Sequence, residues 1–146
     1  MKELMDKLDM TEEYLGILAF KNTIPQDGSI PCDQASVFQT KCWLVSCDLT
    51  RLTTIAEVHA GKTKRLKEDT LNDKKSASEA TSEAGREREA KCNEEYRAVA
   101  YAYVTAEALL NNLLSLKKFF ENGVYVMRSR QDKEAKDWQA TPTTEV

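Results

Sequence analysis

The chain has 146 residues, a length that favours a single domain. Charged residues make up 31% and hydrophobic residues 41%, which is too apolar for a wholly disordered chain and too polar for a membrane protein. No proline occurs between Pro31 and Pro142, whereas β-sandwiches and doubly wound α/β folds need turn residues at short intervals. The composition therefore predicts an all-α protein.

The net charge of −3 is the sum of blocks of alternating sign. Residues 1–20 and 76–96 each carry a net charge of −3, whereas 61–75 and 117–136 each carry +3. A mildly acidic total argues against a general nucleic-acid coat, but it leaves room for a local basic segment.

The N-terminal residues 1–20 are predicted to form a short amphipathic helix, because four leucines fall on one helical face. These are Leu4, Leu8, Leu15 and Leu18. Residues 21–32 contain two prolines and an Asp-Gly pair, which predicts a loop. No basic segment followed by an apolar run opens the chain, so we expect no secretory signal, four reduced cysteines and a cytoplasmic location.

A regular heptad spacing predicts one long helix from near residue 33 to near residue 71. Its seam consists of Phe38, Cys42, Val45, Leu49, Leu52, Ala56, His59, Thr63 and Leu66. Further apolar residues beside this seam, among them Trp43 and Val58, widen the stripe. The wider stripe indicates contact with more than one neighbouring helix.

A second long helix is predicted after the polar residues 71–79, where Ser76 and Glu79 have capping-box spacing. The heptad spacing resumes at Val99 and continues to Phe120. Asn122-Gly123 is expected to end or kink this helix, with a last helical piece ending near residue 138. Residues 139–146 are expected to form a flexible tail.

The predicted architecture of residues 33–138 is a long antiparallel helical hairpin, with short helices at the N-terminus and the C-terminus. Its polar end contains too few apolar residues to bury a globular core, so we expect the seams to close against other copies of the chain. The residues predicted to support this self-association are Val99, Ala106, Leu109, Leu113, Leu116 and Phe120.

Catalytic, cofactor and metal sites are not predicted. Residues 56–63, AEVHAGKT, match a loose phosphate-loop pattern, but they lie inside a heptad run with no preceding strand. The single histidine, His59, lies on the heptad seam, where packing is the usual role. Cys42, Cys47, His59 and Cys92 lack the close paired spacing of a zinc site. One histidine is too few to assemble the usual acid, base and nucleophile.

Two basic segments are candidates for nucleic-acid binding. The first consists of Lys62, Lys64, Arg65 and Lys67, whose alternative interpretation is a solvated flank of a coiled coil. In an oligomer these cations would be multiplied into a belt that contacts phosphates irrespective of base sequence. The second segment places cations beside aromatic rings that could stack on bases, but burial of these rings at the end of the helix is the favoured interpretation. It comprises Lys117, Lys118, Phe119, Phe120, Tyr125, Arg128 and Arg130.

The layout of residues 10–137 resembles the phage recombination mediators of the UvsY type. The shared features are an acidic first helix, DQASVFQTKCWL early in the long helix, and KTKRLK near its end. An apolar helix, YVTAEALLNNLLSLKKFF, and a short basic segment, VYVMRSR, follow. The chain departs from the pattern in its Ser-, Glu- and Arg-rich residues 76–91 and in lacking a tyrosine pair after the basic segment.

The resemblance implies a small all-α cytoplasmic protein that self-associates and has no enzymatic activity. Such a protein binds single-stranded DNA and helps a recombinase replace the single-strand-binding protein. By resemblance, Lys62, Lys64, Arg65 and Lys67 occupy the place of the DNA-contacting cations, and residues 99–130 that of the oligomerising core. The alternative is a structural or adaptor coiled coil, such as a phage virion or scaffold component, that does not bind DNA.

Overall fold

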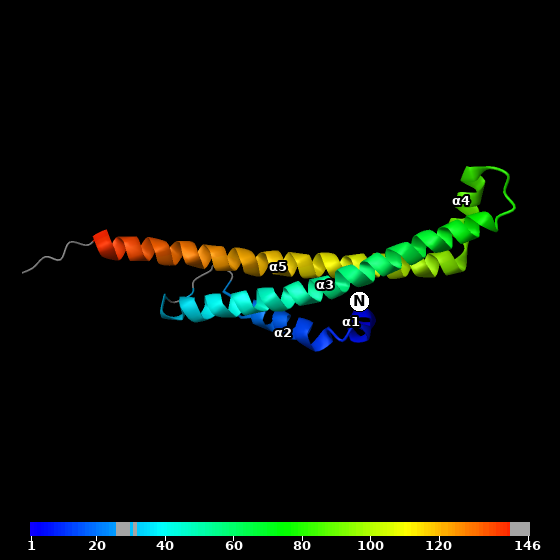
Figure 1. Ribbon diagram of the computed structural model, residues 1–146. Helices are drawn as coiled ribbons and strands as arrows, with labels where there is room; N and C mark the ends of the chain where they lie inside the picture. The colour runs from blue at the N-terminus through cyan, green and yellow to red at the C-terminus, as the bar shows by residue number, and fades with distance from the viewer. Residues whose placement is uncertain (26–29, 31, 141–146) are drawn as a thin grey trace, which may run out of the picture. The chain divides into compact units, whose positions relative to one another are not determined.

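The computed structural model describes residues 1–25, 30 and 32–140, with the side chains of 1–25, 30 and 34–124. The described residues form five helices and no strand, which confirms the all-α prediction (Figure 1). They divide into two compact units, and each of the two longest helices contributes residues to both. Unit 1 contains residues 1–12 and 51–114, and unit 2 contains residues 13–50 and 115–146.

The N-terminal segment forms two helices where one was predicted: α1, Lys2–Lys7, and α2, Thr11–Asn22. Between them Asp9 adopts a left-handed backbone conformation with φ of 54°, which an aspartate tolerates better than most residues. The turn lets Met10, 1% exposed, enter the core, and its N–H donates to the Met5 carbonyl at 3.0 Å. The predicted loop over residues 21–32 lies partly outside the described residues.

The long helix α3, Cys32–Ser76, confirms the first heptad prediction and continues beyond the expected end near residue 71. Lys74 and Lys75 lie in its last turn, where cations interact favourably with the helix dipole. The polar segment that was expected to break the helix therefore contributes its final turn instead.

The second helix begins later than predicted and is interrupted once. The helix α4, Glu83–Cys92, is capped by Ser82, whose Oγ accepts a hydrogen bond from the Gly85 N–H at 3.1 Å. Asn93 then caps α5, Glu94–Ala140, because its Oδ1 accepts from the Glu95 N–H at 3.0 Å. Asn122-Gly123 neither ends nor interrupts α5, which reaches two residues into the predicted tail; residues 141–146 lie outside the described residues.

The core of unit 1 is made by α1, the second part of α3, α4 and the first part of α5. Three leucines in it, Leu52, Leu109 and Leu113, are at most 1% exposed, and several of its other core positions are alanine. Small side chains let helix backbones approach one another closely. The remaining buried residues of this unit are Met5, Met10, Thr53, Ala56, Ala60, Thr70, Ala90 and Ala106.

The core of unit 2 is aromatic. The Phe20 ring of α2 stacks on Phe120 of α5 at 5.8 Å and lies 5.4 Å from the Phe38 ring of α3, measured between centroids. Phe120 is 0% exposed. The other buried residues of this unit are Ile17, Cys42, Leu49 and Leu116.

Most of the residues predicted to hold copies of the chain together are covered within the single chain. Ala106, Leu109, Leu113, Leu116 and Phe120 are buried, and Val99 is half-buried. The helices of each unit thus cover seams that were expected to require other copies. None of the helices in the described residues has both the length and the apolar character needed to cross a membrane.

Candidate nucleic-acid interface

The basic segment predicted to contact DNA lies within α3, and its cations point in different directions around the helix. Lys62, Lys64 and Arg65 are exposed. Successive residues of an α-helix are rotated by about 100°, so Lys62 and Arg65 lie on one side while Lys64 lies well away from Lys62. The three cations form a broad basic surface on one stretch of α3 rather than a single stripe.

Lys67, the fourth predicted cation, is engaged inside unit 1. Its Nζ lies 4.4 Å from the centre of the Tyr103 ring on α5, a cation–π contact. The Tyr103 hydroxyl donates a hydrogen bond to Glu107 Oε1 at 3.0 Å, and this bond raises the pKa of Tyr103 above its ordinary value. Lys67 therefore joins α3 to α5 and is less accessible to phosphate than its three neighbours.

His59 is half-buried one turn before the basic surface. Burial lowers the pKa of His59, and the positive charges of Lys7 and Lys62 lower it further. The lowered pKa of His59 favours the neutral imidazole at pH 7, so this residue adds little charge to the surface. This placement agrees with the packing role expected of a histidine on the seam.

The side chains of the second basic segment differ in burial: some pack in the core and others are exposed. Phe120 belongs to the core of unit 2, whereas Phe119 is 41% exposed with Lys21 Nζ 5.0 Å from its ring centre. Lys117 pairs with Glu121 at 3.9 Å, and Lys118 is exposed. The side chains of the other three predicted members, Tyr125, Arg128 and Arg130, lie outside the described residues.

The segment that resembles a phosphate loop, residues 56–63, is regular helix. A phosphate loop needs consecutive backbone N–H groups turned toward the ligand, whereas those within a helix are used by its own hydrogen bonds. A Cβ at Gly61 would meet no atom within 4 Å, so no close approach requires glycine there. The local structure does not support nucleotide binding at this segment.

The three cysteines whose side chains the structure describes differ in exposure. Cys42 is buried, and burial raises the pKa of its thiol, which makes the reactive thiolate scarcer. Cys47 and Cys92 are exposed. Within the part of the chain that the structure describes, no group of three or more His, Cys, Asp or Glu side chains is placed to hold a metal ion.

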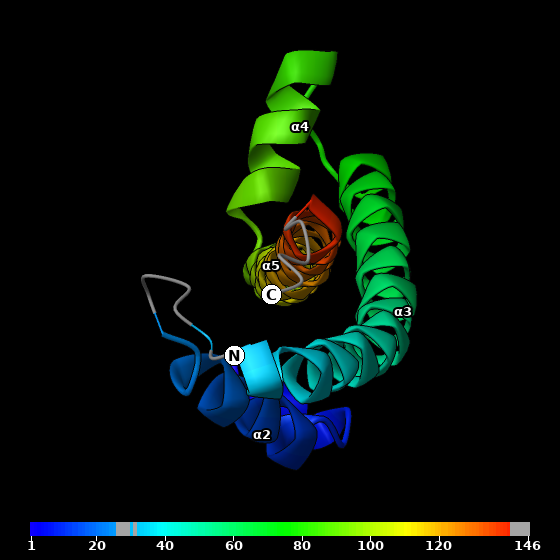
Figure 2. The same ribbon diagram turned by 90° about the vertical axis from the view of Figure 1, so that its left-hand side faces the viewer.

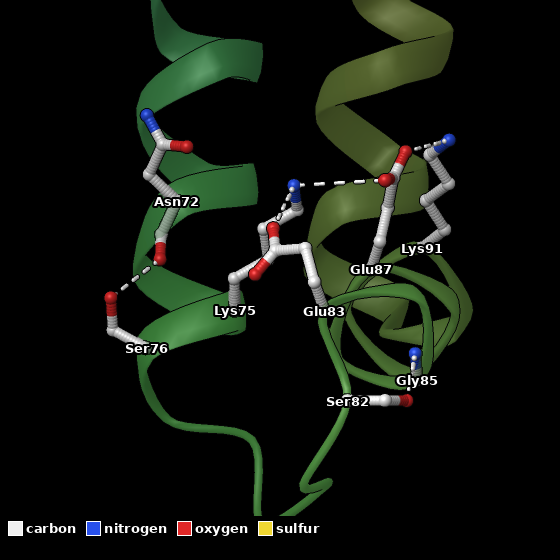
Figure 3. Close-up of polar contacts among 8 residues, drawn as sticks. All are labelled: Asn72, Lys75, Ser76, Ser82, Glu83, Gly85, Glu87 and Lys91. Carbon is white, nitrogen blue, oxygen red and sulfur yellow. Dashed lines mark hydrogen bonds and ion pairs between the residues drawn. The ribbon is translucent and has the colours of Figure 1, made fainter.

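Two cations that sequence reasoning left out of the basic surface lie at the end of α3. Lys74 pairs with Glu95 of α5, and Lys75 Nζ lies 3.2 Å from Glu83 Oε1 and 3.7 Å from Glu87 Oε2 of α4 (Figure 3). They were missed because α3 was expected to end before them. The +3 charge of residues 61–75 was a usable signal, since these two lysines contribute to it.

Comparison with models of protein families, with curated proteins and with solved structures finds no match for the chain.

Proposed function

We propose that the chain is a non-enzymatic recombination mediator that acts in the cytoplasm. It binds single-stranded DNA as an oligomer and assists the loading of a recombinase onto DNA covered by single-strand-binding protein. The observation that carries this proposal is the group of exposed cations Lys62, Lys64 and Arg65 on a continuous helix. Cations held on a preformed helix can neutralise successive phosphates without a cost in backbone ordering.

We propose further that α3 and α5 form a long antiparallel hairpin. Lys67 of α3 contacts Tyr103 of α5, and Lys74 of α3 pairs with Glu95 of α5. From the first contact to the second, the chain advances by seven residues along α3 and goes back by eight residues along α5. The contacts therefore run in opposite directions along the two helices within unit 1. We extend this pairing to the hairpin as a whole.

Self-association is proposed to use side chains that the single chain leaves exposed. On α5 of unit 1, Tyr101 is 75% exposed, Val104 58% and Leu114 47%. Residues 98–115 contain one charged residue, Glu107, so little charge needs to be desolvated when these exposed side chains meet another copy. Each added copy brings a further basic surface to the same DNA strand, which raises the overall affinity.

The test compares two double variants of equal charge. K64A/R65A removes two cations of the basic surface, whereas K2A/K41A removes two exposed lysines elsewhere. At about 0.15 M salt, each lost phosphate contact weakens binding to a single strand about fourfold. Fluorescence anisotropy with a labelled oligothymidylate should show about a tenfold loss or more for K64A/R65A and little change for K2A/K41A.

Both variants should keep the solution mass of the parent, measured by light scattering. Equal affinities for the parent and K64A/R65A would contradict the assignment of this surface. Assembly of the parent without oligonucleotide binding would contradict the mediator function itself.

The second candidate function is a structural or adaptor coiled coil, such as a virion or scaffold component. It is favoured by exposed apolar side chains of unit 2, among them Trp43, 58% exposed, and Leu44, 51% exposed. Such side chains suit contact with a protein partner. This function predicts assembly without affinity for oligonucleotides at physiological salt.

A further inference from the structure

The end of α3 carries a cation, Lys75, that lies on the same side of the helix as Lys64 of the proposed DNA-binding surface. Lys75 follows Lys64 by eleven residues, which is close to three full turns, so the two side chains leave α3 in nearly the same direction. Along the axis they are about 16 Å apart. A single strand that contacts Lys64 can therefore reach Lys75 within a few nucleotides, passing Glu68 on the way.

Lys75 is held by carboxylates from α4. Figure 3 shows Glu83 and Glu87 directed at its Nζ, at 3.2 and 3.7 Å. The Lys75 side chain is 23% exposed, whereas those of Glu83 and Glu87 are 73% and 40% exposed. The neighbouring pair of Lys74 and Glu95 is similar: the Lys74 side chain is 30% exposed and the Glu95 side chain is 66% exposed. The carboxylates thus lie on the outside of the cations, where an incoming phosphate would have to replace them.

The contacts that keep α4 in place are mostly polar. Ala90 is its only buried residue, so apolar burial contributes little to its attachment. Its position beside the end of α3 is seen in Figures 1 and 2. Ion pairs with exposed partners are weak and are screened by salt. A strand with closely spaced phosphates can therefore compete with these carboxylates for Lys75.

We propose that Lys75 is a masked extension of the DNA-binding surface, and that Glu83 and Glu87 are the mask. The inference rests on the proposed function, since it concerns the same surface and the same polyanion. Binding of a strand exchanges carboxylate–lysine pairs for phosphate–lysine pairs and frees α4 from the end of α3. No bond is made or broken.

The test removes the mask by neutralising its carboxylates in the full-length chain. E83Q/E87Q frees Lys75, whereas the control E79Q/E94Q makes the same charge change in nearby exposed residues for which no contact with Lys74 or Lys75 is seen. At about 0.15 M salt, E83Q/E87Q should bind a labelled oligothymidylate about fourfold more tightly than E79Q/E94Q, the gain from one phosphate contact.

A third variant assigns the gain to Lys75. K75A alone should change the affinity of the parent less than twofold, because there the ion pairs that Lys75 gives up on binding offset its phosphate contact, whereas K75A/E83Q/E87Q should lose the fourfold gain. Equal affinities for E83Q/E87Q and E79Q/E94Q, beside a parent that binds and a K64A/R65A variant that binds about tenfold more weakly, would overturn this inference alone. Absence of binding by the parent and all variants would overturn the proposed function and the inference together.

Discussion

Two parts of unit 1 are held together in different ways. Around Leu52 and Leu113, helices pack through side chains that are 0% exposed. Around Lys75 and Glu87, helices are joined by ion pairs near the solvent. Both parts join α3 to helices that follow it in the chain. The first depends on apolar burial, which salt does not weaken, and the second on charge pairs, which salt screens. The difference separates the region that holds the unit together from the region that can exchange partners.

Nucleic acid is expected to act at the part of unit 1 that is held by ion pairs. A polyanion cannot compete with buried leucines, but it can compete with carboxylates that lie over lysines. The basic surface at Lys62, Lys64 and Arg65 lies between the two parts, on the packed helix and near the exchangeable end. The stable part positions the cations, and the polar part controls how many of them are accessible.

The largest expected effect comes from removing apolar volume in the packed part. Leu113→Ala should lower the free energy of unfolding by about 2–5 kcal/mol, because Leu113 is 0% exposed and its loss leaves a cavity. Its neighbour Leu114 is 47% exposed, so Leu114→Ala should cost less than about 1 kcal/mol. Urea unfolding followed by circular dichroism measures both, and equal losses would contradict the burial assigned to this part.

A smaller, stabilising effect is expected at Gly61, which lies in α3 between the two parts. An alanine Cβ there meets no atom within 4 Å, and alanine favours helix over glycine. Gly61→Ala should therefore raise the free energy of unfolding by about 0.5–1 kcal/mol. A destabilised Gly61→Ala, measured by the same urea titration, would indicate that the segment is not the regular helix described.

Salt should affect amide hydrogen exchange in the part held by ion pairs and leave it unchanged in the part held by apolar burial. Raising NaCl from 0.05 to 1 M is expected to increase amide hydrogen exchange in residues 83–92 by roughly two- to fivefold, because the ion pairs of α4 are screened. Exchange in residues 106–113 should stay unchanged. Mass spectrometry of peptides covering both segments gives the comparison, and equal salt responses would contradict it.

The smallest expected effect is the pH dependence due to His59. Its folded-state pKa is lowered, so the unfolded chain binds a proton first as the pH falls below the unfolded value near 6.5. The contribution of His59 to stability is present above that pH and is lost as the pH falls through the folded pKa. Thermal unfolding between pH 7 and 5.5 should show a small decline in Tm for the parent and a flatter profile for His59→Gln.

The carboxylate of Glu87 affects stability at lower pH than His59 does. Hydrogen bonding to Lys91 and the charges of Lys91 and Lys75 lower the pKa of Glu87 below its ordinary value of 4.5. Its contribution is therefore present above pH 4.5 and is lost as the pH falls through the folded pKa. His59 and Glu87 titrate in separate pH windows, so the His59 measurement is free of the titration of Glu87.

Much of the fold follows from the sequence pattern. The spacing of Cys42, Leu49, Leu52 and Ala56 predicts a helix whose seam is buried, as observed. Helix ends were harder to predict, because the end of α3 depends on ion pairs with residues that follow it in the chain. Sequence spacing contains no information on those contacts. The break at Asp9 likewise depends on the burial of Met10 rather than on a glycine or proline.

The sequence was enough to find the segment that contains the candidate site, but not to tell which of its side chains are accessible. Four neighbouring cations are visible in the sequence, yet only the position of Tyr103 shows that Lys67 is engaged by a ring. Lys74 and Lys75 are separated from the segment by three acidic residues in the sequence. The helical repeat brings Lys75 back to the side of Lys64, which a linear reading does not reveal.

DNA binding through the basic surface of α3 is tested most directly by the salt dependence of oligothymidylate binding. This is measured for the parent and for K64A/R65A. For single strands the logarithm of the association constant falls with the logarithm of the salt concentration, with a slope of about −0.7 for each phosphate neutralised. We predict that K64A/R65A flattens this slope by about 1.4 per chain bound, with K2A/K41A unchanged. A slope that K64A/R65A leaves unaltered would contradict DNA binding through this surface of α3.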